Sequence, residues 1–109
     1  MRKSGQGAII TIGAEPGLKP EAKKSAYVAA KAAVIALTRA VAEEGKEVGI
    51  TANSIVPTTI HTKANEEWGT PVEIPNWTAP EDIAATCFFL ASKPGRAING
   101  ATIRIPNRM

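Results

Sequence analysis

The chain has 109 residues, 44% of them hydrophobic, and a formal net charge of +3. This length and composition indicate one globular domain and argue against an intrinsically disordered chain. Basic residues are scattered and aromatic residues make up only 5% of the chain, so no nucleic-acid-binding surface is expected.

The single cysteine, Cys87, excludes an internal disulfide, and no metal site is expected. It lies in the apolar stretch DIAATCFFLAS, where a buried thiol is favoured. A reducing, cytoplasmic compartment is consistent with this cysteine usage. The first apolar run ends at Glu15-Pro16, so no signal peptide is expected. The longest apolar stretch is interrupted by Lys31 and Arg39, so no membrane-spanning helix is expected either.

The first half of the chain predicts a strand, a loop, a helix and a second strand. Residues 7–13 (GAIITIG) form a short apolar run between glycines, typical of a strand buried on both faces. Prolines and glycine over 14–24 predict a loop. Residues 25–47 predict an alanine-rich helix that Gly45 or Gly49 could end. The run at 49–57 predicts the second strand.

The second half predicts an irregular segment, a helix and a third strand. Residues 58–77 contain both tryptophans and show no regular period. The next helix begins with Thr78 and Glu81, which form a capping-box pair, and ends at the KPG triplet. Residues 101–106 (ATIRIP) predict the last strand.

Apolar strands separated by helices predict an α/β fold with right-handed crossovers and a parallel sheet. In open sheets of this kind, ligands bind beyond the carboxyl ends of the strands. Here those ends lie at residues 13–14, 57–58 and 106–107.

Tyr27 and Lys31 lie four residues apart and therefore share one face of the predicted helix. A nearby ammonium group favours the phenolate form and lowers a tyrosine pKa, which suits the phenol for proton transfer at a carbonyl or alcohol oxygen. Such a step accompanies hydride transfer to or from a nicotinamide. On the spacing alone, a tyrosine packed at the helix start beside a solvated lysine is the favoured interpretation.

Several further motifs accompany this pair in a fixed order: GAIITIGA, Y-V-A-A-K, ANSIVP, APEDIA and INGATIRI. Together they resemble the short-chain dehydrogenase/reductase family over nearly the whole chain. The IGA and PTTIHT variants, with a tryptophan before the second helix, are most similar to its dihydropteridine-reductase-like branch. The resemblance implies one partial Rossmann-type domain over residues 1–109, with strand and helix order β-α-β-α-β. It corresponds to the second half of a family domain, without the first dinucleotide-binding half.

The resemblance implies NAD or NADP as cofactor and a small-molecule carbonyl or alcohol as substrate. Tyr27 would give or take the proton, and Lys31 would bind the nicotinamide ribose and lower the pKa of Tyr27. Ala14 and Trp68 would lie on the substrate side. The cofactor-binding residues that it implies are Tyr27, Lys31, Pro57, Thr58, Thr59, Ile60 and Thr62.

Four positions leave alternatives open. Ala14 stands where the family usually has a catalytic serine, although members of the similar branch also carry alanine there. Trp68 and Trp77 either belong to a substrate loop or pack over the edge of the core. His61 stands where that branch often has an acidic residue, and a structural or solvated histidine is favoured over a catalytic one.

The sequence contains no Gly-x-x-x-Gly-x-Gly turn, which the family uses to bind the cofactor pyrophosphate. We therefore expect a fragment or truncated form of an oxidoreductase that is inactive alone. A half-sheet would also leave an edge and a helix face without partners. The alternative is a non-catalytic association module that dimerises, or docks on a full-length relative, through the alanine-rich helix 25–47. Expected partners are thus a second copy or a chain supplying the missing half, with neither nucleic acid nor membrane.

Overall fold

A computed structural model of the chain describes residues 1, 3–14 and 22–107. Most of the predicted loop at 14–24 lies outside the described residues. Short 3₁₀ helices occur at Lys46–Val48, Ile74–Asn76 and Pro94–Ala97. The strands and α-helices, in chain order, are β1 (Gly7–Ile12), α1 (Ser25–Gly45), β2 (Ile50–Pro57), α2 (Lys63–Glu66), α3 (Pro80–Ala91) and β3 (Thr102–Ile105).

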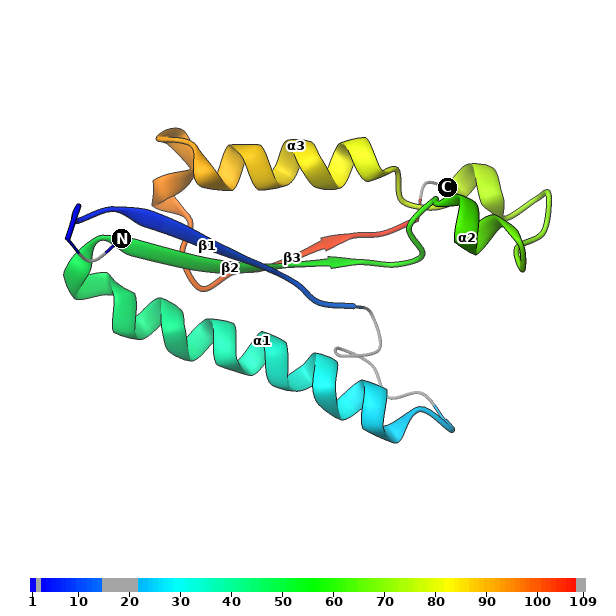
Figure 1. Cartoon of the computed structure of the whole chain (residues 1–109), viewed down its shortest axis with the longest axis horizontal. Helices are drawn as coiled ribbons and strands as arrows, with labels where there is room; N and C mark the ends of the chain where they lie inside the picture. The colour runs from blue at the N-terminus through cyan, green and yellow to red at the C-terminus, as the bar shows by residue number, and fades with distance from the viewer. Residues whose placement is uncertain (2, 15–21, 108–109) are drawn as a thin grey trace.

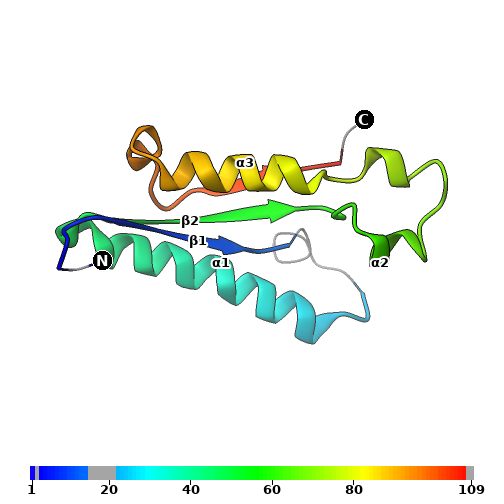
Figure 2. The same ribbon diagram turned by 45° about the horizontal axis from the view of Figure 1, so that its top comes forward.

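The three strands form a parallel sheet in the order β1-β2-β3. Helix α1 covers one face of the sheet and α3 covers the other, so the molecule has three layers (Figures 1 and 2). This arrangement confirms the predicted α/β class and the parallel sheet. The carboxyl ends of the strands, the start of α1 and helix α2 all lie at the same end of the molecule (Figure 1).

The central strand β2 forms the middle of the core. Its side chains are buried along almost the whole strand, and Ile55 and Val56 have no exposed surface. Leu90 of α3 and Ile35 of α1 are also buried. Strand β2 is buried because it lies between two helices, and its buried polar residues Asn53 and Ser54 are hydrogen-bonded.

A row of hydroxyl groups joins α1 to the sheet. The Thr38 hydroxyl donates to the Val34 carbonyl oxygen (2.6 Å) and lies 2.8 Å from the Thr11 hydroxyl, which lies 2.7 Å from that of Ser54. Because each hydroxyl has one proton, the donors run from Ser54 to Thr11, from Thr11 to Thr38, and from Thr38 to the helix backbone. These bonds help fix the position of α1, which carries Tyr27, on β1 and β2.

Replacing Thr38 by valine is expected to lower the free energy of unfolding by about 1–2 kcal/mol, because the Thr11 hydroxyl loses its buried acceptor. Urea denaturation of the isolated chain measures this change. Thr86→Val is the matched control, since the Thr86 hydroxyl donates to the backbone carbonyl oxygen of Asp82 within its own helix (2.8 Å). We expect a change of about 0.5 kcal/mol or less for the control. Equal losses in the two variants would show that the bonds to the sheet contribute nothing.

The predicted capping box at the start of α3 is wrong. Ala79 occupies the N-cap position, and Pro80 is the first helical residue. The Thr78 hydroxyl instead donates to the Ile105 carbonyl oxygen at 3.0 Å. Thr78 is almost completely buried, so its hydroxyl bonds to the end of β3 rather than to the helix that follows.

The end of α1 differs slightly from the prediction. The α-helix ends at Gly45 and continues as the 3₁₀ helix Lys46–Val48. Of the two candidate glycines, Gly49 ends this helical segment, and its φ of 70° is a conformation that favours glycine.

Strands β1 and β3 form the two edges of the sheet within the described residues. Strand β1, with the sequence GAIITI, contains neither charge nor proline. Strand β3 contains the exposed Arg104 and is followed by Pro106. Charges and prolines oppose the addition of another strand at an edge, so the β3 edge is protected and the β1 edge is not.

By length and composition alone, the segment Ser25–Val48 could cross a membrane, with a mean hydropathy of 1.3. This differs from the expectation that no such segment exists. Core helices of soluble proteins meet the same criterion. In this structure α1 packs one face on β2, with Ile35, Thr38 and Ala42 buried.

Candidate active site

Tyr27 and Lys31 lie in the first two turns of α1, as predicted. Tyr27 is 46% exposed. The Lys31 Nζ atom lies 5.8 Å from the centroid of the Tyr27 ring, within the range of a cation–π contact. The structure thus brings the phenol and the ammonium group together at the end of the molecule where the strands terminate (Figure 1). Their chemical roles stay predictions.

Ala14 lies just beyond the carboxyl end of β1. The pairing of β1 with β2 continues to this point, because the Gly13 amide donates to the Ile55 carbonyl oxygen at 2.8 Å. The nearby Thr11 hydroxyl cannot take the place of the serine that the resemblance leads us to expect at position 14. It already donates to Thr38 and accepts from Ser54, which direct it into the interior.

The predicted cofactor-binding residues after β2 form a short extension of the sheet. Ile60 pairs with Thr78 in an isolated parallel bridge. The Thr78 amide donates to the Thr59 carbonyl oxygen (2.8 Å), and the His61 amide donates to the Thr78 carbonyl oxygen (2.9 Å). Pro57 is the last residue of β2 and pairs with β3. These bonds close the two ends of the segment 61–77 against each other.

Hydroxyl groups make further bonds beside these backbone contacts. The Thr58 hydroxyl lies 3.1 Å from that of Thr78 and donates to the side-chain oxygen of Asn107. The Thr62 hydroxyl accepts from the Asn65 amide at 3.2 Å and so caps α2. Because a hydroxyl that accepts a bond keeps its own proton, Thr62 can still donate to a ligand.

The segment 61–77 packs on its own aromatic side chains. Trp77 is only 4% exposed, and its ring lies 4.9 Å from that of Trp68 with a tilt of 39°. Gly69 lies directly against Trp77, since a Cβ atom there would come within 2.2 Å of the ring. Trp68 is 61% exposed. Trp77 therefore packs at the core edge, which is one of the two alternatives, whereas Trp68 is exposed and its place in a substrate loop stays a prediction.

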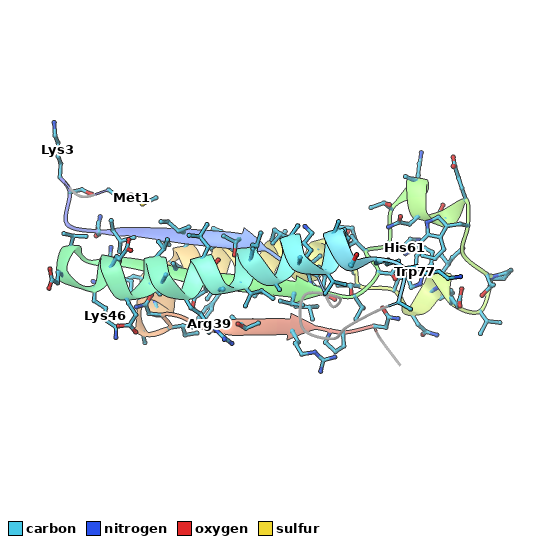
Figure 3. All side chains as sticks on the ribbon, turned by 90° about the horizontal axis from the view of Figure 1, so that it is seen from below. Met1, Lys3, Arg39, Lys46, His61 and Trp77 are labelled. Carbon is cyan, nitrogen blue, oxygen red and sulfur yellow. The ribbon has the colours of Figure 1, made fainter. Side chains whose placement is uncertain are left out.

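His61 has structural partners in this segment. Its Nε2 atom lies 2.7 Å from Oε1 of Glu66. Its ring meets Trp77 edge-on, with centroids 6.3 Å apart and an angle of 80°, and Figure 3 shows the two side chains together. This geometry agrees with the favoured structural interpretation of His61.

Comparison with known proteins adds to this geometry. Residues 1–106 match the family described as "Enoyl-(Acyl carrier protein) reductase". The chain is 36% identical to an acetoacetyl-CoA reductase of Paracoccus denitrificans, covering 98% of this chain and 48% of that protein. It is 31% identical to an oxidoreductase of the short-chain dehydrogenase/reductase family from Burkholderia thailandensis, with a TM-score of 0.86 over 97% of this chain and 45% of that one. This chain belongs to the short-chain dehydrogenase/reductase family.

A third similar structure, a 4-hydroxyisoleucine dehydrogenase complexed with NADH, is 33% identical with a TM-score of 0.81, over 97% of this chain and 48% of that one. The chain thus spans about half the length of the relatives that it matches. Family membership and the partial Rossmann-type fold are confirmed. The assignment to the dihydropteridine-reductase-like branch stays a prediction.

Proposed function

We propose that this chain is part of an NAD(P)-dependent short-chain dehydrogenase/reductase that interconverts a carbonyl compound and an alcohol. One observation carries the proposal: Tyr27 is 46% exposed, with the Lys31 ammonium 5.8 Å from its ring, where the strands of the sheet end. The family supports it, because the similar proteins are reductases and dehydrogenases. The proposed unit is one partial domain over residues 1–109, and a cytoplasmic location stays a prediction.

The residues after β2 would hold the nicotinamide end of NAD(P), whose chemistry when bound is to exchange a hydride with the substrate carbon. The backbone of residues 57–60 and the Thr62 hydroxyl would hold the carboxamide. Lys31 would hold the ribose. The glycine-rich turn that binds pyrophosphate is absent from this sequence, so only part of the cofactor site is built by this chain.

Tyr27 would move the proton. In the reducing direction its hydroxyl donates to the carbonyl oxygen while the carbonyl carbon gains a hydride, which leaves a phenolate beside the Lys31 ammonium. Ala14 offers no hydrogen bond, so on this side the substrate oxygen depends on Tyr27.

A chimera tests the proposal. The part of the Paracoccus acetoacetyl-CoA reductase that supplies the glycine-rich turn, its first half by the resemblance, is placed before the present chain. We expect the folded chimera to oxidise NADH or NADPH when a ketone such as acetoacetyl-CoA is added. A folded chimera that binds the cofactor but transfers no hydride to any of a panel of ketones and aldehydes would contradict the proposal.

The isolated chain is expected to show no measurable binding of NADH or NADPH, because it lacks the glycine-rich turn. Titration to millimolar cofactor, followed by the fluorescence of the reduced nicotinamide, measures this. The chimera, titrated in parallel, is the positive control. Saturable binding by the isolated chain would show that its half of the site is sufficient.

A second candidate function is association through α1. Several small apolar side chains on this helix are exposed. The larger side chain of Leu37 is also 65% exposed. The exposed alanines of this helix are Ala26, Ala29, Ala30, Ala33, Ala36 and Ala40. The partner would be a second copy, a full-length relative or a chain supplying the missing half. Sedimentation showing a well-folded monomer at micromolar concentration would count against self-association.

A further inference from the structure

Asn65 lies between Ile60, on the proposed cofactor side of the candidate site, and Trp68, on its proposed substrate side. Its side-chain Nδ2 donates to the Ile60 carbonyl oxygen at 2.8 Å. Its Oδ1 accepts from the Trp68 indole Nε1–H at 3.2 Å. One amide group therefore bonds both to the backbone expected to meet the cofactor carboxamide and to the tryptophan expected to contact substrate.

Chemistry fixes the orientation of this amide. The Ile60 carbonyl can only accept, and the indole N–H can only donate. A flipped amide would place two acceptors together at Ile60 and two donors together at Trp68. Among side chains of this length, only asparagine offers a donor and an acceptor in the required directions; aspartate has no donor when ionised.

The surroundings hold Asn65 firmly in place. Its backbone amide donates to the Thr62 hydroxyl (3.2 Å), and its carbonyl oxygen accepts from the Trp68 amide (3.2 Å). Ile60 is itself fixed by its bridge to the buried Thr78. The side chain of Asn65 is therefore the direct link between the Ile60 carbonyl and the Trp68 indole.

We infer that Asn65 is a positioning residue that joins the cofactor side of the site to its substrate side. The identity of the two sides rests on the proposed function. Asn65 uses one lone pair of the Ile60 carbonyl and leaves the other for a ligand donor. It thereby sets the direction in which that carbonyl points, and at the same time the place of the exposed Trp68 ring.

The test replaces Asn65 by aspartate in the complete chain and follows solvent exchange of the two indole N–H groups by NMR. The introduced carboxylate keeps the acceptor for Trp68 but loses the donor to Ile60. If the two bonds act together, the Trp68 indole proton exchanges about two- to tenfold faster although its acceptor is still present. If they are independent, the charged acceptor leaves the exchange unchanged or slows it.

Asn76→Asp is the matched control, because Asn76 lies in the same segment and its amide donates to Val72 (3.3 Å) rather than to Ile60. The buried Trp77 indole reports whether the segment stays folded. Faster exchange at Trp68 alone, seen with Asn65→Asp and not with Asn76→Asp, supports the inference. Unchanged or slower exchange at Trp68, or equal acceleration at Trp68 and Trp77, overturns it.

A second variant tests the same inference if Asn65→Asp fails to fold. Trp68→Phe keeps the aromatic ring and removes the indole donor, so the Asn65 side-chain amide protons are expected to exchange faster by a similar factor. Exchange equal to that of the unaltered chain overturns the inference. Neither measurement needs cofactor or substrate, so their failure leaves the role of Tyr27 standing. Conversely, a chimera without hydride transfer would refute the proposed function and leave the bonds of Asn65 intact.

Discussion

Replacing Tyr27 by phenylalanine in the chimera is expected to lower kcat by about 10²–10⁴-fold, the usual contribution of a positioned acid or base. The change removes one oxygen and keeps the ring over which Lys31 lies. Because Ala14 supplies no hydrogen bond, no neighbouring hydroxyl at that position can compensate. The rate of NADH or NADPH oxidation at saturating ketone measures the effect.

Comparing Lys31→Met with Tyr27→Phe separates cofactor binding from proton transfer. Lys31 is expected to hold the ribose and lies over the Tyr27 ring, so its loss should raise the KM for cofactor and also lower kcat. Tyr27→Phe should lower kcat with a smaller effect on the cofactor KM. A Tyr27→Phe chimera that retains kcat within about threefold of the parent would remove Tyr27 from the proton transfer.

Replacing Leu90 by alanine is expected to lower the free energy of unfolding of the isolated chain by about 2–5 kcal/mol. Leu90 is 1% exposed and lies on the face of α3 that covers the sheet. Its truncation leaves a cavity in the core, between the sheet and α3. Since domains of this size are stabilised by about 5–15 kcal/mol, the loss should be evident as a lower urea midpoint.

Phe88→Ala is the matched control in the same helix. Phe88 is larger than Leu90 but 80% exposed. We expect its removal to change the stability of the isolated chain by about 0.5 kcal/mol or less. If Phe88→Ala lowered the free energy of unfolding as much as Leu90→Ala, α3 would bury a different face in solution.

The order and type of the main elements could be predicted because each leaves a local pattern. The glycine-bounded run of β1, the alanine-rich α1 and the strand-like run of β2 each follow from residues close in the sequence. The capping prediction for Thr78 failed because its hydroxyl bonds to Ile105, a residue far along the chain. Local pattern shows that a cap is available but not whether a distant carbonyl competes for it.

The candidate site was predictable only in part. The spacing of Tyr27 and Lys31 follows from helix geometry, and the structure places them together. Nothing in the sequence singled out Asn65 or Thr38, because their partners depend on how separate segments pack. The packing of Trp68 on Trp77 was likewise left open, since spacing within an irregular segment does not fix which rings meet.

The unequal edges of the sheet also determine how copies of this chain can meet when concentrated. Contacts from the β1 edge of one copy to the β3 edge of the next would repeat without end and build a filament. Arg104 and Pro106 oppose that repeat at the β3 edge. Two β1 edges related by a twofold axis satisfy each other and offer no site for a third copy. Crowding is therefore expected to yield closed pairs rather than fibres.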